Sequence, residues 1–373
     1  MSVVSFVYTR KILCASVPSA ARVRSWAERG SSSADITILP RKSVNTLTCS
    51  GSAWHPAKES KPAPGASRIS IENDRLMTPV LLTQVKTRDG MVLDGIVVRP
   101  RRKTKTALVW LHGLSSRFSS GQPLIRELSR RSARSGITYL KFSTRGHDRV
   151  ARDRKRFIGS AFEKFEDCVL DIRAIVNFAK RLGCRNIILA DHSTGANKAL
   201  YYLYKTRDRS VKGLALVGPL NDILAESKRI GRAKLVKAIA IAGKLKNKNP
   251  LALMPQNYGI WTSRRYWSLF HPGEREDVFP YYNPRAGWKE LKSVRPPIAV
   301  IIGSRDEHLD RPAKSLIEVF RAHAAKSKSF SGIIVRSAGH SFIGKEQELA
   351  QSIISWIKGI CNPPSRSSRA SPA

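Results

Sequence analysis

Short apolar runs alternate with longer amphipathic segments along most of this sequence, and this alternation constrains the fold more than any other feature. Six runs have the length of a buried strand, at residues 107–111, 136–142, 186–190, 211–217, 297–302 and 333–335. Segments with helical spacing lie between or after them, at residues 123–134, 162–182, 195–205, 312–325 and 346–358. Strands that alternate with helices of ten or more residues predict an α/β fold. Its central sheet is expected to be mostly parallel, with helices on both faces.

A β-hairpin is expected before this pattern begins. Residues 80–86 and 91–98 alternate between apolar and polar side chains, and they flank Asp89 and Gly90, a pair typical of a two-residue turn. We therefore expect a single folded domain over residues 77–360.

The two ends of the chain have a different composition. Residues 1–76 are rich in Ser, Arg, Ala and Pro, contain few acids and show no period of 2 or 3.6, which predicts a poorly structured extension. The same composition suits an organellar transit peptide, and Met77 also allows a mature protein that starts just before the first strand. Residues 361–373 read as a disordered tail.

The overall charge of the chain is extreme, with 66 Lys and Arg against 28 Asp and Glu and a formal charge of +38. Such a charge favours contact with anionic surfaces. The basic residues are spread along the chain without a nucleic-acid-binding module, so we expect no specific nucleic-acid partner. Five scattered cysteines suggest neither a disulfide framework nor a metal site, which favours the cytoplasm. No apolar run is long enough to predict a membrane-spanning helix.

Residues with catalytic potential follow the predicted strands, where parallel α/β sheets bind their ligands. Ser193 lies in the sequence Asp-His-Ser-Thr-Gly at 191–195, between a buried strand and a helix. A serine on such a turn projects its hydroxyl from the sheet edge, and the backbone N–H of Thr194 then points at a developing oxyanion. The alternative role for Ser193 is that of an ordinary helix N-cap.

Two further turns supply an oxyanion donor and a base. Leu114 closes the sequence His-Gly-Leu directly after the strand at 107–111, and its backbone N–H is the candidate for the second oxyanion donor. His340 lies in Gly-His-Ser after the last strand, from where a histidine can reach the serine as general base and then protonate the leaving group.

A carboxylate to orient the histidine is expected after the strand at 297–302. Asp306 follows Gly-Ser-Arg in that turn and is our candidate, with Glu307 and Asp310 as local alternatives. Each motif alone is common. Together they follow the chain order Ser, Asp, His, each at the carboxyl end of a predicted strand, and that combination is specific.

On these motifs the sequence resembles the α/β-hydrolase superfamily over residues 77–360. Within it, four stretches are similar to a group of bacterial and fungal hydrolases that includes siderophore-ester hydrolases, at residues 145–148, 165–168, 192–198 and 277–281. The resemblance implies hydrolysis of an ester, thioester or related acyl bond through a Ser-His-Asp triad. It also implies an acyl-enzyme intermediate, with neither cofactor nor metal.

One position departs from the pattern of the superfamily. Two residues before the serine a glycine or another small residue is usual, and this chain has Asp191. Its bulk and charge would lie where the turn is tightest, which could strain the turn or shift the pKa of His340. A non-catalytic α/β-hydrolase homologue that binds a small molecule is therefore the alternative reading.

The segment between the strands at 211–217 and 297–302 is too long for a simple connection. We expect a helical lid at about 221–290. Within it lysines recur at helical spacing opposite apolar residues, at 234, 237, 244 and 248. This basic amphipathic helix predicts either a solvated lid face or a weak contact with an anionic surface. The expected partner is a small ester-type substrate, and the sequence does not set an oligomeric state.

Overall fold

The computed structural model describes residues 79–361. The expected extension at 1–76 lies outside the described residues, as does the expected tail apart from Cys361, which ends the last helix. Within the described part of the chain, no helix is long and apolar enough to cross a membrane.

An eight-stranded sheet forms the centre of the fold, in the order β1-β2-β4-β3-β7-β8-β9-β10, and the prediction of a mostly parallel sheet is confirmed. The hairpin of β1 (Val80–Lys86) and β2 (Val92–Val98) is antiparallel, and β2 is antiparallel to β4. The remaining strands run parallel: β3 (Thr106–Leu111), β4 (Thr138–Phe142), β7 (Asn186–His192), β8 (Val211–Val217), β9 (Ile298–Gly303) and β10 (Phe330–Val335). The carboxyl ends of β3 and β7–β10 therefore meet at one edge.

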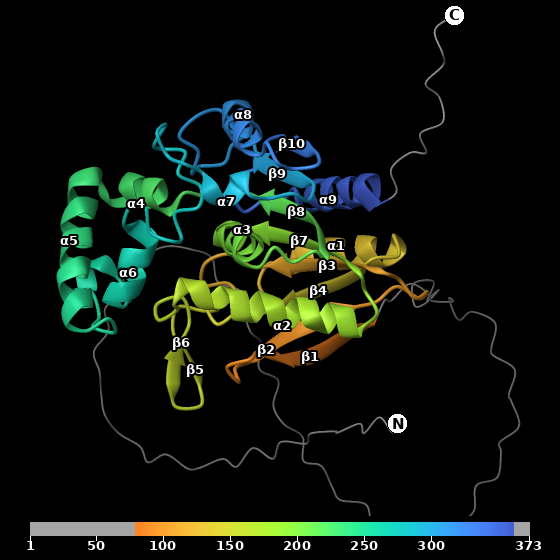
Figure 1. Ribbon diagram of the computed structural model, residues 1–373, viewed down its shortest axis with the longest axis horizontal. Helices are drawn as coiled ribbons and strands as arrows, with labels where there is room; N and C mark the ends of the chain where they lie inside the picture. The colour runs from red at the N-terminus through yellow and green to blue at the C-terminus, as the bar shows by residue number, and fades with distance from the viewer. Residues whose placement is uncertain (1–78, 362–373) are drawn as a thin grey trace, which may run out of the picture. The chain divides into compact units, whose positions relative to one another are not determined.

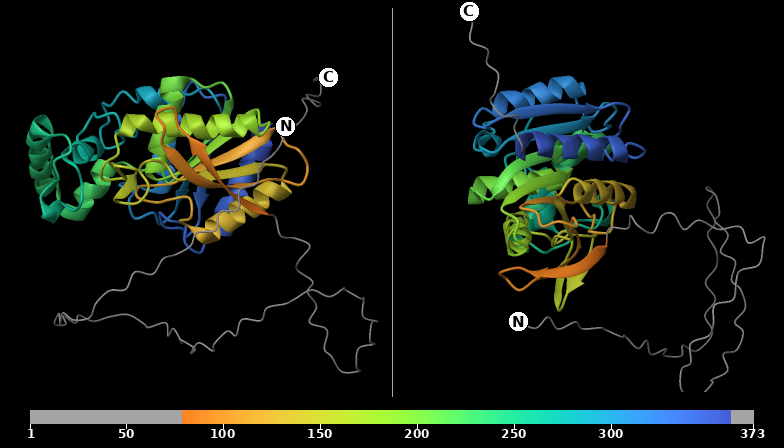
Figure 2. Two further views of the ribbon diagram at one scale, coloured as in Figure 1. Left: turned by 90° about the horizontal axis from the view of Figure 1, so that it is seen from below. Right: turned by 90° about the vertical axis from the view of Figure 1, so that its right-hand side faces the viewer.

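Helices cover both faces of this sheet, as the alternating pattern predicts (Figures 1 and 2). One face packs on α1 (Gln122–Arg134) and α9 (Glu346–Cys361) through an apolar cluster that includes Leu128 and Ile353. The other packs on α2 (Cys168–Arg181), α3 (Thr194–Thr206) and α8 (Ala313–His323). Strand residues alternate between these two clusters, which is why the parallel strands are buried on both faces.

The helix expected at 162–182 starts later than its apolar spacing indicates. The α-helix begins at Cys168, after a short 3-10 turn at Phe165–Asp167. Glu163 is buried in an ionic cluster, and Lys164 has extended backbone, so neither residue continues the helix. The sequence also gave no sign of the small hairpin of β5 (Ala151–Asp153) and β6 (Arg156–Ile158).

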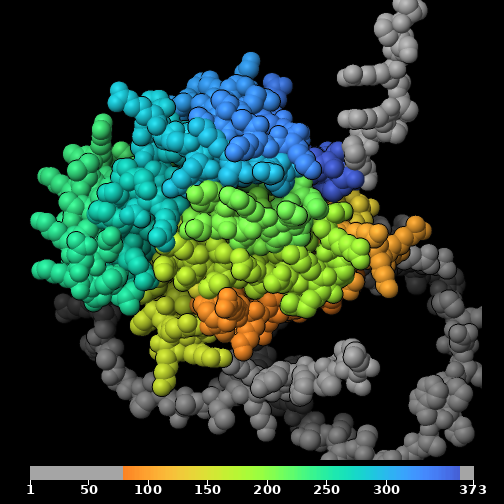
Figure 3. Space-filling view, viewed as in Figure 1, coloured from red at the N-terminus to blue at the C-terminus, as the bar shows by residue number. Residues whose placement is uncertain are grey.

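Between β8 and β9 the chain forms a helical insertion, which runs from residue 221 to residue 292. It contains α4 (Asp222–Ile230), α5 (Arg232–Lys248), η3 (Gln256–Tyr258), α6 (Ser263–Phe270) and α7 (Lys289–Lys292). Helices α4 to α6 share an apolar cluster of their own, and their surface is continuous with that of the sheet domain (Figure 3). In α5, Lys234 and Lys237 are exposed while Leu235 is buried, so the helix is amphipathic as its spacing indicates.

Candidate active site

Ser193 stands on a sharp turn between β7 and α3. Its backbone has φ 57° and ψ −128°, a conformation that a non-glycine residue adopts only under strain. The Ser193 N–H donates to the Val217 carbonyl at 3.0 Å, which ties the turn to β8. A Cβ on Gly195 would come within 2.8 Å of the Leu111 and His112 carbonyl oxygens, so glycine alone fits there. The turn thus holds the serine at the carboxyl edge of the sheet.

Asp306 and His340 lie in contact at the same edge. Asp306 follows β9 and His340 follows β10, and because these strands are parallel neighbours their ends meet. His340 Nδ1 lies 2.9 Å from Asp306 Oδ2. Burial raises the pKa of the Asp306 carboxyl, but the hydrogen bond and charge of His340 outweigh it and hold that pKa below its ordinary value. The carboxylate therefore fixes the ring with a proton on Nδ1 and leaves Nε2 as the basic nitrogen.

The two local alternatives to Asp306 have other contacts. Glu307 Oε2 accepts the backbone N–H of His340 at 2.9 Å, so it positions the histidine loop and does not touch the ring nitrogens. Asp310 pairs with Arg311 at 2.7 Å. Of the three acids, Asp306 alone contacts the imidazole of His340.

Ser193 and His340 make no hydrogen bond with each other. His340 Nε2 is buried and has no partner among the described residues. A Cβ on Gly218 would lie 3.2 Å from the His340 ring, and one on Gly113 would lie 3.1 Å from the Ser193 Cβ. Glycines at both positions keep the space around the two side chains open. Catalytic hydrogen bonds are often long without substrate and tighten when it binds.

The two candidate oxyanion donors flank the serine. Thr194 is the first residue of α3, and Leu114 follows Gly113 in the loop after β3. Neither backbone N–H donates a hydrogen bond to another described residue. Both donors are therefore available to an oxygen that develops negative charge beside Ser193.

Three further histidines surround the site. His192 Nε2 lies 2.9 Å from the His340 carbonyl oxygen, and burial lowers the pKa of His192 to about 4. His112 contacts the Gly113 carbonyl and the Thr144 N–H, and burial lowers its pKa to about 3. Both are neutral residues that hold the loops. His308, whose ring lies 4.6 Å from that of His340, was not anticipated because nothing in its sequence neighbourhood marks it.

Asp191, the departure from the superfamily pattern, lies at the end of β7 and is fully buried. Neither of its carboxyl oxygens has a hydrogen-bond partner among the described residues. Burial raises the pKa of Asp191 well above its ordinary value. The side chain therefore favours the protonated form and adds no fixed negative charge next to Ser193.

A buried ionic cluster beside the site was missed by the sequence analysis. It joins Lys198 and Arg265 to Glu163 and Glu276, and all four side chains are at most 2% exposed. Lys198 Nζ lies 2.6 Å from Glu163 Oε1, and Arg265 Nη2 lies 3.3 Å from Glu163 Oε2. The cluster links α3, which carries the Thr194 donor, to α6 of the insertion. Charged residues far apart in sequence give no periodic signal, so only the fold reveals this contact.

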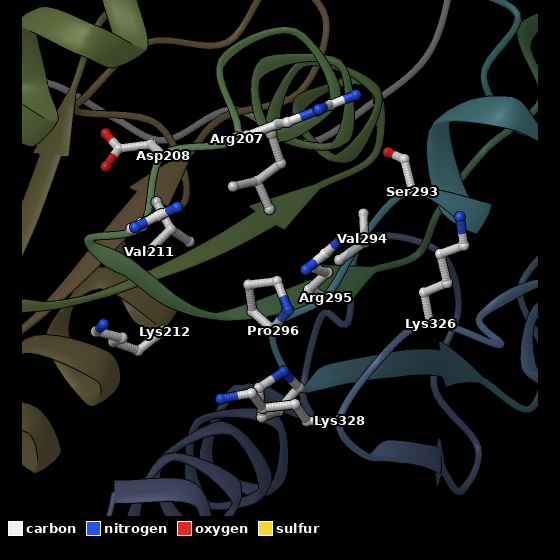
Figure 4. Close-up of a pocket in the computed structure, with 13 residues that line it drawn as sticks. Arg207, Asp208, Val211, Lys212, Ser293, Val294, Arg295, Pro296, Lys326 and Lys328 are labelled. Atoms are coloured by element: carbon white, nitrogen blue, oxygen red, sulfur yellow. The ribbon is translucent and has the colours of Figure 1, made fainter.

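A basic hollow of about 610 Å³ lies at the opposite, amino-terminal edge of the sheet (Figure 4). Leu203, Val211 and Val294 are among its apolar lining residues, and Asp208 is the one acid. Six cations also line it: Arg207, Arg209, Lys212, Arg295, Lys326 and Lys328. The loops that form it lead into β8, β9 and β10, whereas Ser193, Asp306 and His340 follow strands. The hollow therefore does not belong to the candidate active site.

Solved structures similar to this chain share its architecture. A soluble variant of a monoglyceride lipase from Saccharomyces cerevisiae is 14% identical, with a TM-score of 0.56 over 76% of this chain and 97% of that chain. A thermostable carboxyl esterase from Bacillus coagulans is 13% identical, with a TM-score of 0.53 over 76% and 99%. An esterase from Pyrococcus furiosus is 16% identical, with a TM-score of 0.50 over 76% and 94%. At these identities the likeness establishes the α/β-hydrolase fold.

Sequence comparison adds a family. No curated protein matches the chain. One family model matches residues 156–359, more than half of the chain, and its description is a protein of unknown function, DUF1749. The chain is thus a member of the DUF1749 family and has the α/β-hydrolase fold.

Proposed function

We propose that this protein is a serine hydrolase that cleaves an ester, thioester or related acyl bond. The observation that carries the proposal is the strained turn of Ser193 at the same sheet edge as the contact between His340 and Asp306. A plain N-cap serine needs neither the strained backbone nor a histidine oriented by a buried carboxylate. The esterases and the lipase that share the fold support the same class of reaction.

In the proposed reaction, Ser193 Oγ attacks the carbonyl carbon of the substrate while its proton passes to His340 Nε2. The N–H groups of Leu114 and Thr194 stabilise the oxyanion of the tetrahedral intermediate. The bond to the leaving group breaks, and the leaving oxygen or sulfur takes the proton from His340. A water molecule then attacks the acyl-enzyme with His340 again as base, which releases the acid and restores Ser193. Asp306 holds the ring throughout.

Labelling by a fluorophosphonate probe tests this proposal. The wild-type protein should be labelled, and Ser193→Ala and His340→Ala should each abolish labelling, because the probe reacts only with an activated serine. Ser315→Ala is the matched control, since Ser315 is exposed on α8 and has no proposed role in catalysis or binding. Equal labelling of wild type and Ser193→Ala would refute the proposal.

A non-catalytic binding protein is the second candidate. It is favoured by one observation, the missing hydrogen bond between Ser193 and the unpartnered His340 Nε2. A folded wild type that the probe does not label would support it. The finer resemblance to siderophore-ester hydrolases and the cytoplasmic location remain predictions.

A further inference from the structure

A cavity of about 480 Å³ lies beside the catalytic loops, on the face of the sheet covered by α1 and α9. Its lining includes three residues that neighbour the proposed machinery in sequence. Gly113 precedes Leu114, His192 precedes Ser193, and Ser341 follows His340. Trp110 and Phe342 add apolar walls. The cavity is therefore close to the point where the proposed chemistry takes place.

Lys141 of β4 lines this cavity and is only 3% exposed. Its Nζ donates a hydrogen bond to the Ser120 carbonyl, and it forms no ion pair within the described residues. Burial lowers the pKa of Lys141 to about 8. An ammonium group has three donors, so two are left after the bond to Ser120. Burying a cation without a counter-ion costs free energy, and a ligand that supplies the opposite charge would offset that cost.

Tyr139 supplies a second unused donor in the same cavity. It lies two residues before Lys141 on β4, so both side chains project from the same face of the sheet. Tyr139 is fully buried, and its hydroxyl has no hydrogen-bond partner among the described residues. A buried hydroxyl without a partner costs free energy unless a ligand bonds to it.

The start of α1 forms another part of the wall. Gly121, Pro123 and Leu124 line the cavity, and the helix has no side-chain cap at its N-terminus. Free N–H groups at a helix start favour an anion. Glu346 is the single acid among the lining residues, and it makes no ion pair with Lys141. Tyr139, the unpaired cation of Lys141 and the start of α1 thus line the same cavity.

We propose that this cavity is a subsite for a carboxylate carried by the acyl part of the substrate. Its donors are the ammonium of Lys141, the hydroxyl of Tyr139 and the backbone N–H groups of Gln122 and Leu124 at the start of α1, where Pro123 has none. The inference rests on the proposed function, because the subsite serves the ester bond cleaved at Ser193. The substrate class is then the monoester of a dicarboxylic acid.

Strand pairing gives the approximate length of that acid. Lys141 pairs with Trp110 on β3, and Trp110 pairs with Ala190 on β7, three residues before Ser193. Two strand spacings separate β4 from β7, and the three residues from Ala190 to Ser193 add a similar distance along the strand, so the Lys141 and Ser193 Cα atoms are roughly 14 Å apart. A carboxylate at Lys141 therefore requires several methylene groups between it and the ester carbonyl. Six- and eight-carbon diacids have such chains.

The test compares hydrolysis of two charged esters with that of neutral esters of equal carbon number. The charged substrates are the p-nitrophenyl monoesters of adipic and suberic acid, and the neutral ones are p-nitrophenyl hexanoate and octanoate. One charge-assisted hydrogen bond corresponds to at least about a tenfold effect. The wild type should therefore show at least about a tenfold higher kcat/KM for a charged ester than for its neutral counterpart.

Lys141→Met should bring this ratio of kcat/KM values close to one. Lys314→Met is the matched control, because it removes the same charge from an exposed site on α8 and should leave the ratio unchanged. Tyr139→Phe removes only the hydroxyl and should lower the ratio severalfold, which keeps the test decisive if Lys141→Met does not fold.

Two failures are distinguishable. If the wild type hydrolyses both kinds of ester with equal kcat/KM, and Lys141→Met and Tyr139→Phe leave the ratio unchanged, the carboxylate subsite is wrong and the proposed hydrolase stands. If the folded wild type hydrolyses neither kind of ester and is not labelled by the fluorophosphonate probe, the proposed function falls and the subsite falls with it.

Discussion

Replacing Asp191 with Asn should make the protein more stable, and the gain should grow with pH. Asp191 is fully buried, its carboxyl oxygens have no partner, and burial raises its pKa well above the ordinary value. Above the ordinary pKa the unfolded chain releases this proton while the folded protein keeps it. The unfolded state then binds fewer protons than the folded state, so the free energy of unfolding falls as pH rises. Asn has the same shape and cannot ionise.

The size of the effect follows from the linkage between protonation and folding. Each pH unit between the unfolded and folded pKa of Asp191 costs the wild type about 1.4 kcal/mol of unfolding free energy. The advantage of Asp191→Asn should therefore increase by about 1.4 kcal/mol for each pH unit, up to the pH at which the folded protein also releases this proton. For a domain of this size, each kcal/mol corresponds to roughly 2–4 °C in Tm.

Urea unfolding of both proteins at pH 5, 6 and 7 measures this difference. Asp153→Asn serves as the control for loss of one negative charge, because Asp153 pairs with the exposed Arg156 on the surface hairpin. A gap between wild type and Asp191→Asn that stays constant over this pH range would refute the reasoning. It would mean that the carboxyl is solvated or paired, and that Asp191 places a charge beside the serine.

Three further predictions follow from the site and its surroundings. Asp306→Asn should lower kcat for steady-state ester hydrolysis by roughly 10³–10⁴-fold with little change in Tm, because the amide no longer fixes the His340 tautomer. An unchanged kcat would show that Asp306 does not belong to the triad. Lys198→Met should lower the free energy of unfolding, measured by urea titration, by about 3–5 kcal/mol, because Glu163 loses its partner at 2.6 Å. A change below about 1 kcal/mol would contradict this account. Wild type should elute from heparin at moderate salt. Removing Arg209, Lys212 and Lys328 from the basic hollow should lower the eluting salt concentration more than removing Lys234, Lys237 and Lys244 from α5. The reverse order would favour α5 as the anionic contact.

Local sequence patterns were sufficient to predict the mostly parallel sheet and the order of the candidate site residues along the chain. Ser193, Asp306 and His340 each follow an apolar run, and parallel strands bring such positions to one edge whatever the details of packing. The choice of Asp306 over Glu307 was also predictable from its place in the turn. The contact of Asp306 with the His340 ring agrees with that choice.

Contacts between distant segments could not be read from the sequence. The unused donors at Lys141 and Tyr139 depend on how α1 packs over β4, and the sequence shows only a polar residue in an otherwise apolar strand. The late start of α2 has the same origin, because Glu163 is held by Lys198, 35 residues away. The spacing between Ser193 and His340 depends on side-chain positions at two separate loops, which no local pattern determines.

The ionic cluster of Lys198, Glu163, Arg265 and Glu276 affects how this protein folds. Arg265 donates to the Ser160 carbonyl across 105 residues of sequence, so the cluster closes only when these two distant segments have come together. The insertion between β8 and β9 then contributes to the same cooperative transition as the sheet, and it does not unfold as a separate module. Transplanting it onto a related scaffold would leave Glu163 without Arg265, one of its two cationic partners. An evolutionary exchange of this segment therefore requires coordinated changes in α3 and in the turn before α2.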